Sequence, residues 1–168
     1  MNQRIPSSAK VVVIGGGVAG CSVAYHLAKY GWNDVVLLER DQLTSGTTWH
    51  AAGLIGQLGA SATLTKIRNH SLNLYKELEN ETELSSGLKQ NGSLTVATTK
   101  GRLDELKRQV TTAQLFNVDA FEVSIDKIKE IYPLINVEDV IGGVFIPDDG
   151  QADPVGVTNV LAKAAKQN

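Results

Sequence analysis

The chain begins with two short apolar runs, and the stretch between them has helical spacing. Residues 11–14 (VVVI) are β-branched and end at a glycine, which is typical of a buried parallel strand. Residues 18–30 predict a helix, with apolar positions at Val23, Leu27 and Tyr30. Gly31 follows as its C-terminal cap, and residues 34–38 (DVVLL) predict a second buried strand. The pattern therefore predicts a strand–helix–strand unit with parallel strands.

After this unit the periodicity disappears and then returns. Residues 40–60 are rich in Gly, Thr and Ala, and so long a loop inside a compact domain is usually functional. Further along, the pattern predicts two amphipathic helices, at residues 64–82 and 103–113. It predicts three strands, at residues 92–98, 120–123 and 141–146. A short helix at residues 124–132 is capped by Ser124 and ends before Pro133.

The last part of the chain predicts a turn followed by a helix. Asp148-Asp149-Gly150 is typical of a turn, and Asp153 with Pro154 forms an N-cap and first-turn pair. One face of this last helix carries Val157, Val160, Leu161 and Ala164. Since a strand–helix unit normally leads to another parallel strand, we expect an α/β fold that forms the front part of a longer enzyme and is inactive alone.

The composition of the chain argues against several classes of function. The 168 residues carry a net charge of −2, and 42% of them are hydrophobic, which is ordinary for a globular protein. No basic stripe indicates nucleic acid, and the longest apolar run is too short and too glycine-rich to span a membrane. Cys21 is the only cysteine, so no disulfide forms within the chain. Residues 1–10 lack a signal or transit pattern. We therefore expect a cytosolic protein, unless its true N-terminus has been removed.

A dinucleotide-binding fingerprint joins the first strand to the first helix. Gly15, Gly17 and Gly20 form G-x-G-x-x-G, and Glu39 ends the second strand. Gly15 allows a tight turn, Gly17 lets the backbone approach a pyrophosphate, and Gly20 allows close packing of helix on strand. The helix N-terminus attracts phosphate, and Glu39 accepts hydrogen bonds from ribose hydroxyls while repelling a 2′-phosphate. The fingerprint predicts a dinucleotide site but does not separate FAD from NAD.

The segment after Glu39 distinguishes these two cofactors. Residues 45–54 (SGTTWHAAGL) offer backbone N–H and hydroxyl donors for further pyrophosphate contacts. The stretch from Glu39 to His50 could span at most about 36 Å, enough to reach along an extended dinucleotide. Together with VVVIGGGVAG and LLER, GTTWHAAGL resembles the flavin domain of the sarcosine and dimethylglycine dehydrogenases. The segments NGSL, YPL and DGQADP extend the resemblance over nearly the whole chain. The segments TSGTTWH and QNG favour sarcosine dehydrogenase over dimethylglycine dehydrogenase.

The resemblance implies an FAD site and a covalent flavin. In that family the histidine of TWH is bonded to the 8α carbon of the flavin, and His50 occupies its position. A neutral imidazole is a suitable nucleophile for this bond. The expected cofactor-binding residues are Gly15, Gly17, Val18, Ala19, Gly20, Glu39, Arg40, Gly46, Thr47, Thr48, Trp49, His50, Ala51, Ala52, Gly53 and Leu54. No catalytic residue is identified in this portion, and Trp49 suits either an aromatic wall beside the flavin or core packing.

The family also implies a division of the chain and a reaction. Residues 1–60 and 152–168 would belong to the FAD-binding domain, and 61–151 to a substrate domain with an antiparallel sheet. The enzyme would oxidise an N-methyl amine, with an electron-transfer flavoprotein or oxygen as acceptor. The one-carbon unit would be captured by tetrahydrofolate in a further domain or released as formaldehyde. The compartment would be the cytoplasm in a bacterium, or the mitochondrial matrix in a eukaryote once a transit peptide is removed.

Two other functions fit the same pattern. One is a D-amino-acid or glycine oxidase type of flavoenzyme, most of which hold FAD non-covalently. The other is a non-catalytic relative such as the regulatory subunit of pyruvate dehydrogenase phosphatase. Cys21 is interpreted as a small core residue, and His26 and His70 as surface or packing residues. The aspartates at 148, 149 and 153 are explained by the turn and the N-cap, so no metal is expected.

Overall fold

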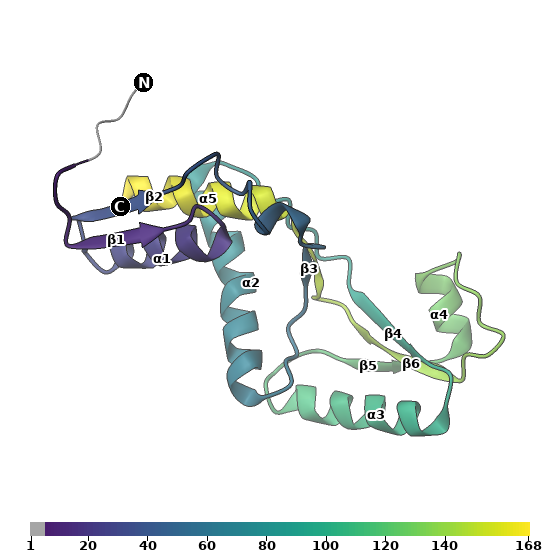
Figure 1. Ribbon diagram of the computed structural model, residues 1–168. Helices are drawn as coiled ribbons and strands as arrows, with labels where there is room; N and C mark the ends of the chain where they lie inside the picture. The colour runs from purple at the N-terminus through teal and green to yellow at the C-terminus, as the bar shows by residue number, and fades with distance from the viewer. Residues whose placement is uncertain (1–5) are drawn as a thin grey trace. The chain divides into compact units, whose positions relative to one another are not determined.

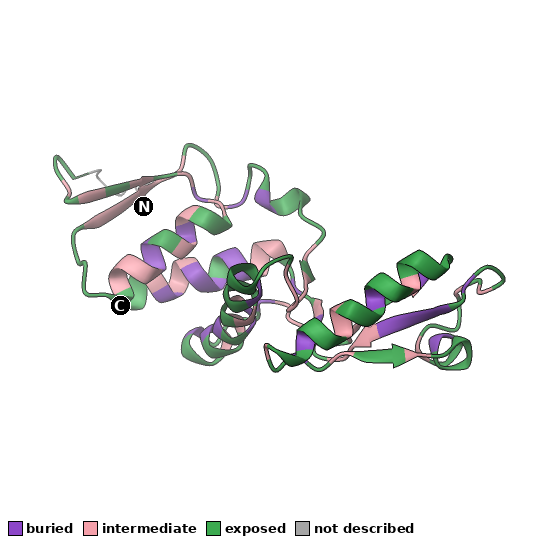
Figure 2. Cartoon of the chain, turned by 90° about the horizontal axis from the view of Figure 1, so that it is seen from below, coloured by how far each residue is buried: buried purple, intermediate pink, exposed green. Residues whose placement is uncertain are grey.

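Two helices lie side by side along one side of a two-stranded parallel sheet (Figures 1 and 2). The computed structural model describes residues 6–168. Strands β1 (Val11–Ile14) and β2 (Val35–Leu38) pair in parallel. Helix α1 (Val18–Lys29) connects them, and helix α5 (Pro154–Gln167) packs against α1. The predicted strand–helix–strand unit is therefore confirmed.

Small side chains form the contact between these helices. The buried residues of α1 are Cys21, Ala24 and Tyr25. Those of α5 include all four predicted apolar positions, which confirms that face: Val157, Val160, Leu161 and Ala164. The face expected for α1 was wrong, because Val23 and Tyr30 are 49% and 77% exposed. Close packing of α5 favours the side of α1 that carries small residues, and only tertiary contacts reveal which side that is.

A separate three-stranded antiparallel sheet has the order β4-β6-β5. Its strands are β4 (Ser93–Ala97), β5 (Phe121–Val123) and β6 (Gly142–Ile146). Helix α3 (Lys100–Gln114) packs on this sheet over a core of Ala97, Leu106 and Val144. Helix α4 (Ile125–Ile131) begins at Ser124, whose hydroxyl accepts a hydrogen bond from the Lys127 amide at 3.3 Å. The expected antiparallel sheet is confirmed.

The segment expected to be one irregular loop contains two short elements. A 3-10 helix, η1, covers Thr48–His50, and strand β3 covers Leu54–Ile55. Strand β3 pairs antiparallel with β7 (Gly150–Gln151). A two-residue strand has no detectable period, and its partner is remote in sequence. For the same reason the predicted turn at 148–150 is only partly correct, since Gly150 lies in β7 and Asp149 is buried.

The described chain forms two compact units. The first takes in residues up to Gly53, Leu74–Leu88 and Ala152–Asn168, and the second takes in Leu54–Asn73 and Lys89–Gln151. Helix α2 (Ala62–Thr82) contributes residues to both. The expected division by function, with boundaries at residues 60 and 152, stays a prediction. Among the described residues, no helix has the length and apolar character needed to cross a membrane.

Candidate dinucleotide-binding site

The turn between β1 and α1 has the geometry that the glycine fingerprint predicts. Gly15 has φ +109°, a conformation that glycine adopts without strain. Gly20 lies in the first turns of α1, where a Cβ would overlap the carbonyl oxygen of Gly15. The strand and the helix can therefore approach this closely only because both positions are glycine.

Gly16 is a part of this site that the sequence analysis missed. Its amide donates to Oε2 of Glu39 at 2.6 Å, and its carbonyl accepts from the Thr44 amide at 3.0 Å. A Cβ on Gly16 would lie 2.6 Å from a methyl carbon of Leu43. The loop after β2 thus folds back onto the β1–α1 turn because the middle glycine of GGG has no side chain. The uninterrupted run of three glycines was the available signal.

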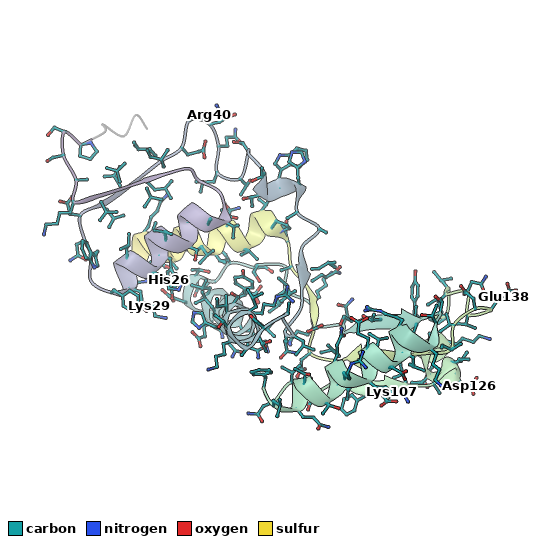
Figure 3. All side chains as sticks on the ribbon, turned by 60° about the horizontal axis from the view of Figure 1, so that its bottom comes forward. His26, Lys29, Arg40, Lys107, Asp126 and Glu138 are labelled. Carbon is teal, nitrogen blue, oxygen red and sulfur yellow. The ribbon has the colours of Figure 1, made fainter. Side chains whose placement is uncertain are left out.

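Glu39 is held as an ionised acceptor. Its Oε2 atom accepts from Gly16, and its Oε1 atom accepts from the Asp41 amide at 3.1 Å. These backbone hydrogen bonds, chiefly the one from Gly16, lower the pKa of the Glu39 carboxyl. A carboxylate offers about four lone-pair sites, so acceptor capacity remains for ribose hydroxyls. Arg40, next in the chain, is exposed on the loop that follows β2 (Figure 3).

Thr48 connects the two predicted motifs within the first unit. Its Oγ1 atom accepts from the Val18 amide, the first residue of α1, at 3.0 Å. Thr48 is buried, and a Cβ on Gly17 would lie 2.8 Å from its Oγ1 atom. Gly17 therefore makes room for Thr48 as well as for the phosphates that the sequence analysis considered. Because Oγ1 already accepts from Val18, the Thr48 hydroxyl hydrogen is available to a further acceptor.

The aromatic pair after Thr48 lies at the surface. The rings of Trp49 and His50 have centroids 3.9 Å apart and an interplanar angle of 35°. Trp49 is 56% exposed, so in this structure it is not a core residue. His50 is also exposed, and its amide donates to the Thr47 carbonyl at 3.2 Å, which closes the turn of η1. The imidazole is therefore accessible to a large ligand.

The other residues of the expected site are placed in different ways. Ala19, Gly46, Thr47, Ala51 and Ala52 are exposed. Gly53 has a structural role, because its φ is +72° and its carbonyl accepts from the Ala152 amide at 2.8 Å. Leu54 begins β3 and belongs to the second unit. The structure thus brings together the Gly15–Gly20 turn, Glu39 and Thr48.

These residues fit one end of a dinucleotide. The first turn of α1, which the structure describes completely, carries no acidic side chain that would repel phosphate. The helix N-terminus adds a partial positive charge, and Glu39 supplies an acceptor for hydroxyl groups. Burial raises the pKa of the Cys21 thiol, with a smaller contribution from Glu39, so this cysteine is a neutral core residue. Among residues 6–168, no group of three or more His, Cys, Asp or Glu side chains is placed to hold a metal ion.

Comparison with known proteins defines the class of this protein. Residues 10–168 match the family of FAD dependent oxidoreductases (DAO), and the chain belongs to this family. In the solved L-proline dehydrogenase from P. horikoshii, a similar fold covers 97% of this chain and 43% of that one, with a TM-score of 0.89 and 31% identity. FAD is therefore the cofactor that membership of the family implies.

The curated relatives place the chain within the family. It is 47% identical to human mitochondrial sarcosine dehydrogenase over 165 residues, which are 98% of this chain and 18% of that protein. Human mitochondrial dimethylglycine dehydrogenase is 45% identical, over 95% of this chain and 18% of its own length. The mouse mitochondrial regulatory subunit of pyruvate dehydrogenase phosphatase is 40% identical, over 98% and 19%. The chain therefore spans less than a fifth of the length of each of these three curated relatives.

Proposed function

We propose that this chain is the N-terminal, FAD-binding portion of an enzyme that oxidises an N-methyl amine such as sarcosine or dimethylglycine. The exposed His50 carries the proposal, because Thr48 fixes its segment to the N-terminus of α1. The 47% identity to a sarcosine dehydrogenase supports the substrate class. Bound FAD would supply the two-electron oxidation of the carbon next to the amine nitrogen.

In this proposal each part of the first unit holds a different part of FAD. The amides of Gly15, Gly16 and Val18 already donate to Leu38, Glu39 and Thr48, so the other amides of the glycine turn and of the first turn of α1 would donate to the pyrophosphate. Glu39 would accept from the adenosine ribose. The Thr48 hydroxyl donates to a phosphate oxygen while its Oγ1 atom keeps the hydrogen bond from Val18. The remaining contacts come from the segment that starts at Gly46, with the exposed Trp49 ring as a wall beside the flavin.

A covalent bond from the His50 imidazole to the 8α carbon of the flavin would complete the site. The bond would prevent loss of the cofactor without any demand on equilibrium affinity. Alkylation withdraws electron density from the ring system, so the tethered flavin becomes a stronger oxidant. A stronger oxidant suits an amine methyl group as electron donor.

The partners and compartment follow from the same resemblance. Electrons would pass to an electron-transfer flavoprotein or to oxygen. The one-carbon unit would pass to tetrahydrofolate bound elsewhere in the protein or leave as formaldehyde. The relatives named sarcosine and dimethylglycine dehydrogenase are mitochondrial. We place this protein in the mitochondrial matrix if its source is a eukaryote, and in the cytoplasm if its source is a bacterium.

Acid precipitation tests the covalent bond. The protein at its native length is precipitated, and flavin is measured in the pellet and the supernatant. Wild type should give a yellow pellet and a peptide containing His50 with the added mass of the flavin. His50→Ala should release its flavin, whereas His70→Ala, which changes an exposed histidine on α2, should retain it. A colourless wild-type pellet would contradict the bond and favour the glycine oxidase type of enzyme.

The identity to a phosphatase regulatory subunit supports a second candidate, a regulatory protein without turnover. Anaerobic mixing with sarcosine or dimethylglycine separates the two. Bleaching of the flavin absorbance supports the enzyme. A bound flavin that neither amine reduces supports the regulatory protein.

A further inference from the structure

Asn91 and Gly92 form the single Asn-Gly pair of the sequence, directly before β4 in the second unit. Asn91 is exposed. An asparagine before glycine is prone to lose its side-chain amide, because glycine has no side chain to obstruct attack by its own backbone nitrogen on the side-chain carbonyl carbon. Asn117 and Asn136 are also exposed in this unit, but each precedes a valine, whose branched side chain obstructs the same step.

The fold requires the glycine of this pair. Gly92 has φ +80°, which glycine adopts without strain, and a Cβ there would lie 2.4 Å from two ring carbons of Phe145. Phe145 belongs to β6 and is the cross-strand partner of Leu94 in β4. Any larger residue after Asn91 would displace this ring from the sheet, so the reactive pair is tied to the packing of the second unit.

A hydrogen bond holds the nitrogen that would attack. The Gly92 amide donates to the Asp149 carbonyl at 2.8 Å. To attack the Asn91 side chain, this nitrogen must give up its proton. The Asp149 carbonyl oxygen stabilises the protonated amide and would repel the anion that remains after loss of the proton. The Asn91 side chain is therefore exposed to water, while the group that would attack it is blocked.

Neighbouring contacts keep Asp149 in place. The residue is 4% exposed, its Oδ2 atom accepts from the Ser93 hydroxyl at 2.6 Å, and its Oδ1 atom accepts from the Gln57 amide at 2.7 Å. Nearby, the Nε2 atom of Gln90 donates to the Asp148 carbonyl at 2.8 Å. The blocked amide is released only when these contacts open, and a local opening of this kind takes less free energy than unfolding of the whole protein.

We propose that Asn91 is a site of spontaneous deamidation and that local opening around Asp149 sets its rate. The Gly92 nitrogen bonds to Cγ of Asn91, the bond from Cγ to Nδ2 breaks, and ammonia leaves with the proton of the Gly92 amide. Water then opens the succinimide, giving aspartate when it adds to the side-chain carbonyl carbon and isoaspartate when it adds to the main-chain carbonyl carbon. Isoaspartate lengthens the main chain by one carbon atom just before Gly92, where the fit against Phe145 is already tight. The inference does not depend on the proposed function.

Mass spectrometry of the protein at its native length, aged in mildly alkaline buffer, tests the site. A synthetic peptide of residues 87–97 gives the rate without the fold. In folded wild type, Asn91 should convert to aspartate and isoaspartate, at least about tenfold more slowly than in the peptide. Asn117 and Asn136 should stay intact. Electron-transfer fragmentation distinguishes isoaspartate from aspartate.

Two variants test the control of the rate. Ser93→Ala removes a donor to Asp149 and should speed the reaction about fivefold, relative to a peptide with the same substitution. Gln90→Ala removes the hydrogen bond to the Asp148 carbonyl and should act in the same direction. Circular dichroism establishes that each variant is folded.

Ser71→Ala is the matched control. The Ser71 hydroxyl donates to the Ile67 carbonyl within α2, so its loss should leave the rate at Asn91 unchanged. Equal rates in the folded protein and the peptide would overturn the proposal, because the fold would then give no protection. An Asn91 that stays intact in folded wild type and in both variants would overturn it too. So would folded Ser93→Ala and Gln90→Ala proteins that react no faster than the control.

Discussion

The Thr48 hydroxyl oxygen lies 3.0 Å from the Val18 amide and accepts its hydrogen bond. This bond joins the loop that carries His50 to the first residue of α1 within the first unit. The amide and the hydroxyl are remote in sequence, and each belongs to a motif that predicts cofactor binding by itself. Their contact makes the glycine turn and the TTWH segment parts of one site.

Loss of the Thr48 acceptor should weaken the site, while a serine should preserve it. Thr48→Val keeps the shape but leaves the Val18 amide without its acceptor, and we expect about tenfold weaker FAD retention together with a smaller covalent fraction. Thr48→Ser keeps the hydroxyl and should resemble wild type. FAD dissociation during dialysis is measured in the His50→Ala background, where the flavin is not tethered, and the covalent fraction is measured as flavin in the acid pellet of the single variants. Equal behaviour of the two variants would show that the hydroxyl has no part in binding.

Gly20→Ala should destabilise the protein, because it forces apart the strand and the helix that form the glycine turn. The new Cβ would overlap the Gly15 carbonyl, so strand and helix must separate, at a cost of about 1–3 kcal/mol in the free energy of unfolding. Gly101→Ala in α3 is the control, because a Cβ there meets no atom within 4 Å and alanine favours a helix. Urea unfolding of both variants checks this. A Gly20→Ala protein as stable as Gly101→Ala would contradict the described packing.

Glu39→Ala should weaken retention of FAD but not of FMN, which lacks the adenosine ribose. The lowered pKa of Glu39 adds a pH prediction. The ionised acceptor is present throughout the neutral range and is lost only as pH falls through this lowered pKa. In the His50→Ala background, where the flavin is not tethered, FAD affinity should therefore stay constant from neutral pH through the ordinary range of glutamate titration and decline only below it, which fluorescence titration would measure. Equal losses of FAD and FMN in the variant would show that Glu39 does not act by binding the adenosine ribose.

Glu79 should contribute pH-dependent stability. Its Oε1 atom accepts from the Ser86 amide at 2.6 Å and from the Ser86 hydroxyl at 2.7 Å, and these bonds lower the pKa of Glu79. A lowered pKa stabilises the folded state above the ordinary glutamate pKa, and this contribution disappears as pH falls through the lowered value. Glu79→Gln should cost about 1 kcal/mol at neutral pH, and the difference from wild type should vanish in acid.

Thermal unfolding across pH provides the measurement for Glu79. Glu77→Gln on the same helix is the control, because Glu77 is exposed and should show little change at any pH. A deficit in Glu79→Gln that persists unchanged into strong acid would exclude the charge as its cause.

The sequence by itself determined the features that depend on local spacing. The β-branched run before Gly15, the cap at Asp153 and the alternating pattern at residues 92–98 all correspond to observed elements. Each has a short-range physical signal: hydrophobic period, a side chain that caps the following amides, or a backbone conformation that glycine favours. The family resemblance, carried by GTTWHAAGL, could likewise be recognised from the residues alone.

Only the tertiary structure decided the features that join remote segments. The buried face of α1, the pairing of β3 with β7 and the burial of Asp149 depend on partners far along the chain. Gly16 gained its role from Glu39 and Thr44, and Gln57 gained its fixed backbone from Asp149. A glycine, an aspartate or a glutamine has no local pattern that names its partner, because hydrogen bonds and close packing are set by distance in space and not by distance along the chain.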